Sequence, residues 1–97
     1  MRADYDSEGD TVQIDLEVVD RVDYGDGDVD DGLVISICDG RPVRIDVIGT
    51  GGDLVGSLRR AGEHYGLDSE ALLAAAQAAV AAPDREVRLD VRSHAAA

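Results

Sequence analysis

Hydrophobic and polar residues alternate along several stretches of the chain, which is the pattern of strands with one buried face. The strictest alternation lies at residues 11–18, and two further alternating arms lie at residues 33–37 and 43–47. The turn dipeptide Asp39-Gly40 lies between these two arms, so they predict a β-hairpin. The hairpin would place six aliphatic side chains on one face of a sheet: Leu33, Ile35, Ile37, Val43, Ile45 and Val47.

Two shorter segments extend the predicted sheet. A strand near residues 2–5 precedes the alternating stretch and joins it through the acidic turn 6–10. Carboxylates in such a turn are typical of a solvated hairpin tip, because an acid-base pair needs a pocket that separates the two pKa values. Near the C-terminus, residues 86–92 alternate again and predict a strand whose Arg88 and Arg92 offset the acidic strands beside it.

Helical spacing of apolar residues replaces the alternation in the second half of the chain. Residues 53–65 predict a helix that is capped by Asp53 and stopped by Gly66. A second helix follows the N-cap Asp68, and residues 71–82 are almost all helix formers. The order of elements predicts an α+β fold. It has an antiparallel meander of about four strands, two helices packed on one face, and a C-terminal strand added to the sheet.

The chain of 97 residues is long enough for a single domain. Within it we distinguish a β-rich module, residues 1–50, and a helix-helix-strand extension, residues 51–97. The interior must be aliphatic, because the chain has no Phe or Trp and only three Tyr. Such a core buries less apolar area per residue than an aromatic one, so we expect a second copy to add burial in a homodimer.

Charge restricts the class of partner. The formal net charge is −12, with 21 acidic residues against nine Arg and no Lys. Residues 1–48 hold 14 acidic residues and four Arg, a balance of −10. We expect no nucleic-acid partner, because no basic cluster is present, and no membrane partner, because no apolar run approaches roughly 20 residues. A basic protein is the partner class that this charge favours, and a single cysteine, Cys38, favours the cytoplasm.

Two acidic-turn motifs lie in the first fifty residues: YDSEGDTVQIDL and, further on, DDGLVISICDGRPVRIDVIG. Together they resemble the small bacterial family catalogued as domain of unknown function 2283. The family pattern is matched here by Tyr5-Asp6, Glu8, Asp10, Asp31-Gly32, Gly40 and residues 43–48. The resemblance covers residues 1–50 and implies a small β-rich module without a catalytic residue to carry over. The spacer between the motifs is longer and more acidic here than in the family.

That spacer, residues 20–31, contains six Asp among its twelve residues. Asp26, Asp28 and Asp30 repeat at every second position, as at the start of an EF-hand loop, and their oxygens suit Ca²⁺. The rest of the EF-hand pattern is missing, because Asp31 stands where Gly is required and Ile37 where a bidentate Glu should be. The spacer is therefore interpreted first as a mobile acidic loop and alternatively as a divalent-cation site.

Signals for catalysis or a cofactor are weak. Residues 49–52, GTGG, precede a helix, but Leu54 replaces the third glycine of a dinucleotide-binding loop and no Lys follows. Ser57 and His64 lie seven residues apart on a helix, which a nucleophile-base hydrogen bond hardly spans, and Cys38 is interpreted as a packed thiol whose acidic neighbours raise its pKa. We expect no catalytic residue and no cofactor. The leading hypothesis is a non-enzymatic protein-interaction or regulatory module.

Overall fold

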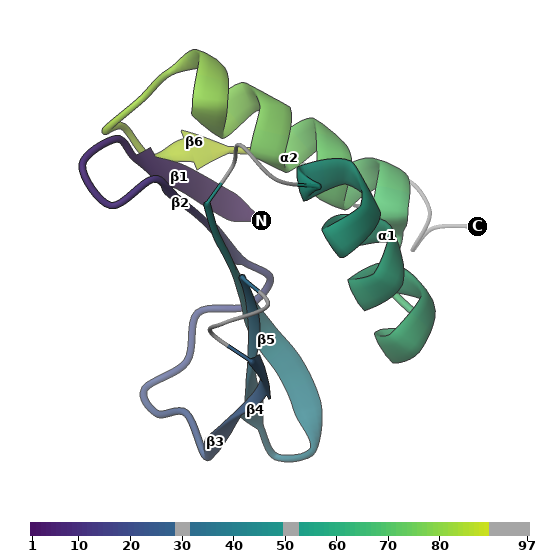
Figure 1. Cartoon of the computed structure of the whole chain (residues 1–97). Coiled ribbons are helices and arrows are strands. Elements are labelled where there is room, and N and C mark those ends of the chain that lie inside the picture. Colours follow the sequence, from purple (N-terminus) through teal and green to yellow (C-terminus); the bar gives the residue numbers. More distant parts are fainter. Residues whose placement is uncertain (29–31, 50–52, 90–97) are drawn as a thin grey trace.

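The computed structural model describes residues 1–28, 32–49 and 53–89, and it confirms the α+β class (Figure 1). Six strands form one sheet in the order β3-β4-β5-β2-β1-β6, and every neighbouring pair is antiparallel. The strands are β1 (Arg2–Asp6), β2 (Thr11–Asp15), β3 (Tyr24–Asp28), β4 (Leu33–Cys38), β5 (Arg41–Ile48) and β6 (Val87–Arg88). The helices are α1 (Leu54–Tyr65) and α2 (Ser69–Ala81).

The predicted hairpin of β4 and β5 forms the second and third strands of the sheet, counted from β3. Asp39 and Gly40 both have positive φ angles, 53° and 77°, as a tight turn between twisted strands requires. Ile45 on β5 lies opposite Ile35 on β4 and opposite Ile14 on β2. These three side chains are at most 2 % exposed, so the alternation correctly predicted which face is buried.

Both helix caps predicted from sequence are present. The Asp53 carboxylate accepts a hydrogen bond from the Gly56 N–H, and the carboxylate of Asp68 accepts from the N–H groups of Glu70 and Ala71. Gly66 ends α1 in the left-handed conformation. One hydrophobic cluster joins the two helices to the sheet through buried residues of α1 and α2: Leu58, Ala61, Leu72, Leu73, Ala75, Ala76 and Ala79.

The helices cover the sheet unevenly (Figure 1). Helix α2 packs on β1 and β2, while α1 packs on α2 and on β5. The part of the sheet formed by β3, β4 and the hairpin end of β5 extends away from the helices in Figure 1. Leu33 on β4 is therefore only half-buried, although it lies on the core side. No helix among the described residues is long and apolar enough to span a membrane.

Two expectations about the first half of the chain need correction. The spacer is not a loop throughout, because residues 24–28 form the edge strand β3 and pair with β4. Strand β2 ends at Asp15 rather than near residue 18, and Val18 is 71 % exposed. The chain turns there because the N–H groups of Leu16 and Glu17 both donate to the carbonyl oxygen of Val43.

The C-terminal strand is added to the sheet as predicted, but Arg88 has a different partner. Its guanidinium pairs with Glu86 at 3.1 Å, just before its own strand. Arg2 on β1 instead connects this end of the chain to the sheet, since its guanidinium reaches both Asp15 on β2 and Glu86 just before β6. Arg92 lies outside the described residues.

Replacing Gly27 by Ala tests whether β3 is a strand. Gly27 has a φ of +107°, and a Cβ added there would lie 2.4 Å from the carbonyl oxygen of Leu33. We expect Gly27→Ala to lower the free energy of unfolding by about 2–3 kcal/mol, measured by urea denaturation. Gly40→Ala is the control, because Gly40 also has positive φ but nothing lies within 4 Å of its added Cβ. Equal losses in the two variants would show that β3 does not pack on β4.

Candidate functional site

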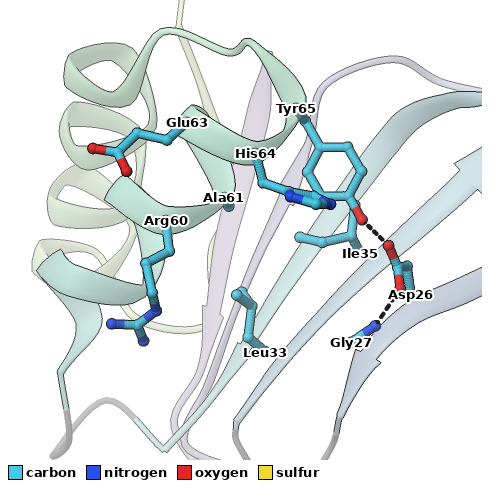
Figure 2. A pocket seen from close by; sticks show the side chains of 9 residues that line it. All are labelled: Asp26, Gly27, Leu33, Ile35, Arg60, Ala61, Glu63, His64 and Tyr65. Carbon is cyan, nitrogen blue, oxygen red and sulfur yellow. Dashed lines mark hydrogen bonds between the residues drawn. The ribbon is translucent and has the colours of Figure 1, made fainter.

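The described residues form a groove between the C-terminal half of α1 and the strands β3 and β4 (Figure 2). Its volume is about 400 Å³. The apolar part of its lining comes from Leu33, Ile35 and Ala61. The polar part comes from Asp26 on β3 and from four consecutive or nearly consecutive residues of α1: Arg60, Glu63, His64 and Tyr65.

The groove exists because the helix side of the sheet is wider than the layer that covers it. Tyr24 and Asp26 on β3 lie opposite Ile37 and Ile35, so they belong to the helix side of the sheet. No helix is packed on this strand in Figure 1. Tyr24 is consequently 58 % exposed, and Asp26 is exposed as well.

Tyr65 bridges the groove. Its hydroxyl donates a hydrogen bond to Oδ2 of Asp26, while Oδ1 of Asp26 accepts one from the Gly27 N–H at 3.0 Å (Figure 2). Burial raises the pKa of Tyr65 to about 12, and the hydrogen bond to the Asp26 carboxylate contributes in the same direction. The His64 ring packs edge-on against the Tyr65 ring, with centroids 4.7 Å apart. The end of α1 and the edge strand are thus held together by one polar contact.

The positive charge at the groove is already engaged. The Arg60 guanidinium donates to Ser57 Oγ at 3.2 Å and lies 3.9 Å from the Asp53 carboxylate, toward the start of α1. Glu63, by contrast, is exposed, and the described residues give it no ion-pair partner. The groove therefore offers the carboxylates of Asp26 and Glu63, an aromatic ring and an apolar surface to a ligand.

The residues predicted as a cation site are only partly brought together. Asp26 and Asp28 lie in β3, and Asp30 lies outside the described residues. Alternate residues of an extended strand are about 6–7 Å apart, whereas an EF-hand loop wraps around its ion. One oxygen of Asp26 is also engaged by Tyr65. Ca²⁺ binding at these positions stays a prediction.

A second group of possible ligands lies at the tip of the β4–β5 hairpin. Asp23, Cys38 and Asp39 each offer an atom, and these atoms lie within 4.8 Å of one another. The Arg21 guanidinium already pairs with both carboxylates, at 3.1 Å and 2.6 Å. Burial raises the pKa of the Cys38 thiol, with Asp39 and Asp23 adding to it, so the protonated form is favoured at neutral pH. The group is a salt-bridged turn around a packed thiol, as expected for Cys38.

The structure does not bring Ser57 and His64 together. Ser57 is buried and accepts from Arg60, whereas His64 is exposed and contacts Tyr65. The glycine-rich segment is described only at Gly49, since residues 50–52 lie outside the described residues. His64 was weighed as a catalytic base in the sequence, and the structure places it instead at the groove.

The sheet face opposite the helices carries a second acidic surface. Asp15 on β2 lies between Arg2 and Arg44, and its carboxylate accepts from both guanidinium groups. In the adjacent row, Gln13 lies between Asp4 on β1 and Asp46 on β5. Burial raises the pKa of both Asp4 and Asp46, and the nearby carboxylate of Asp15 adds to the shift in each case. Alternation predicted a polar face, but only the strand register reveals this row.

Replacing Asp46 by Asn tests whether the half-buried Asp46 carboxylate destabilises the folded state, through the pH dependence of the unfolding temperature. A carboxyl group whose pKa is raised in the folded state destabilises the fold at pH values above that pKa and ceases to do so once it is protonated. We therefore expect Asp46→Asn to unfold at a higher temperature than the wild-type chain at pH 7, with the difference vanishing near pH 3. Asp20→Asn, which removes one exposed charge, is the control. An equal gain in the control would assign the effect to net charge alone.

Comparisons of this chain with family models, with curated proteins and with solved structures found no match. The resemblance of residues 1–50 to domain of unknown function 2283 therefore stays a prediction.

Proposed function

We propose that this chain is a non-enzymatic interaction module that binds a basic segment of a partner protein in the groove between α1 and the β3–β4 edge. The observation that carries the proposal is the combination found in one groove: the carboxylate of Asp26 beside the ring of Tyr65, an apolar surface, and a second carboxylate, Glu63, on the other side of α1 from Tyr65 (Figure 2). Arg60 also lines the groove, but its guanidinium donates to Ser57 and lies 3.9 Å from Asp53, toward the start of α1 and away from Asp26 (Figure 2).

This combination suits the chemistry of Arg and Lys side chains. Their aliphatic stems pack on apolar surface while their charged ends stay near water or a carboxylate. Leu33 and Ile35 offer the apolar surface, and the carboxylates of Asp26 and Glu63 offer the charge. An aromatic ring such as that of Tyr65 adds a cation–π attraction when a cation lies over its face.

The charge of the whole chain supports the same class of partner. The net charge of −12 creates a negative field that speeds encounter with basic proteins and repels polyanions. Ten of these charges come from residues 1–48, which include β3 and β4. Long-range attraction and the local carboxylates of the groove therefore act in the same direction.

A homodimer and a cytoplasmic location are further parts of the proposal. Val55 on α1 and Val80 on α2 are 43 % and 38 % exposed, and a second copy would bury such side chains. A reducing compartment is supported by the single, buried cysteine, which has no partner for a disulfide within the chain.

Sedimentation equilibrium separates the dimer from the divalent-cation alternative. We expect twice the monomer mass at moderate salt, unchanged by Ca²⁺ or by EDTA. A mass or a melting temperature that follows Ca²⁺ saturably at micromolar concentration would favour the cation site instead. In that case, changing Asp26, Asp28 and Asp30 together to Asn should abolish the effect.

Binding of a defined basic peptide tests the groove. The probe is a capped hexapeptide of alternating Arg and Thr, titrated by calorimetry at low salt. We expect the double variant Asp26→Asn with Glu63→Gln to bind about tenfold more weakly, because each exposed ion pair contributes up to about 1 kcal/mol.

The matched control is Glu8→Gln with Asp20→Asn, which removes the same charge from exposed positions outside the groove. Equal weakening in both double variants would show that net charge alone drives binding and would overturn the groove as the site. Full retention of affinity in the groove variant would overturn it as well.

A further inference from the structure

We infer that the free edge of β3 accepts an extended segment of the partner as an added strand, and that this segment carries Arg or Lys at every second position. The inference rests on the proposed function and specifies how the basic segment is bound. It adds main-chain pairing to the side-chain contacts of the groove, as in other proteins that bind peptides at a sheet edge.

The edge of β3 is open. β3 is the terminal strand of the sheet, and among the described residues it pairs only with β4. All the residues from 21 to 27 are exposed. A strand in this position leaves a row of main-chain N–H and C=O groups without a partner strand, which is a template for pairing with another chain.

The composition of β3 favours close approach of another backbone. Its sequence is YGDGD, and the glycines at positions 25 and 27 leave no side chain on the face opposite the helices. Glycine within a strand often marks a place where another backbone comes near. The strand also lacks Lys and Pro, and the register shift of the neighbouring ladder lies between β4 and β5, at Ser36 and Ile37, away from the free edge of β3. Lys, Pro and a bulge are the usual protections of an edge strand against pairing, so β3 is protected only by its negative charge.

Charge decides which segment fits this edge. If β3 of a second copy paired here, acidic residues would face acidic residues, and like charges directly opposite each other destabilise a sheet. The chain as a whole carries −12, so two copies repel each other at this edge, whereas a basic segment is attracted to it. The favoured occupant is therefore a basic partner rather than another copy.

The register of β3 sets the spacing of the basic residues. Tyr24 and Asp26 lie opposite Ile37 and Ile35, on the helix side of the sheet. In an added strand, every second side chain would point to the same side, where the groove and the Asp26 carboxylate lie. Basic residues at positions i, i+2 and i+4 would then line up with this side, and residues between them would lie over the glycines.

Four capped hexapeptides of equal charge test the inference by calorimetry. The first alternates Arg and Thr, and the second contains the same residues with Arg in adjacent pairs. We expect the first to bind about tenfold more tightly, because only alternation places all its charges on one face of a strand. The third and fourth are N-methylated forms of the alternating peptide. One carries the methyl groups on the backbone nitrogens of residues 1, 3 and 5, and the other carries them on those of residues 2, 4 and 6.

Only every second residue of an added antiparallel strand donates its N–H to the neighbouring strand. We therefore expect one methylated peptide to lose at least about tenfold in affinity and the other to bind like the parent. Equal binding of all peptides, weakened by Asp26→Asn with Glu63→Gln, would overturn the added strand and leave the groove as a binding site. Absence of binding by every peptide would overturn both.

Discussion

The pairing of β5 with both β2 and β4 is the constraint on which the rest of the structure depends. β5 is the longest strand, and Ile45 at its centre lies between Ile14 and Ile35 in a buried row across three strands. A shift of this register by one residue would turn the aliphatic side chains out of the core. The register also fixes the opposite face, where it brings Arg2, Asp15 and Arg44 into one ion-paired row.

The groove follows from an imbalance between the sheet and its cover. Among the described residues six strands form the sheet, but α2 lies over β1 and β2, and α1 packs on β5 and reaches the edge strand β3 only with its C-terminal end (Figure 1). β3 and the Leu33 end of β4 are less covered on the core side, and a hydrogen bond from Tyr65 to Asp26 connects β3 to α1. A narrow helical layer built from Ala-rich α2 is enough to bury the central strands and leaves an acidic edge accessible. The binding function proposed for this chain uses that accessible edge.

The sequence predicted the elements whose signals are local. The β4–β5 hairpin followed from alternation and Asp39-Gly40, and both helices followed from their caps. β3 was missed because a YGDGD segment has neither hydrophobic alternation nor strand propensity; it forms a strand through main-chain pairing with β4. The groove could not be predicted, because Asp26 and Tyr65 are 39 residues apart and meet only once α1 is placed beside the edge. His64 and Tyr65 were recognised as helix residues, but nothing in the sequence indicated what they face.

If the β3 edge and the end of α1 form one binding surface for a basic segment, an NMR titration of the uniformly ¹⁵N-labelled chain with the alternating Arg-Thr peptide should locate it. We expect saturable changes of backbone amide shifts concentrated in β3 and in residues 60–65, with slower amide exchange along β3 in the complex. Changes confined to the Asp4, Gln13 and Asp46 row, or spread evenly over the acidic surface without a maximum at β3, would contradict it.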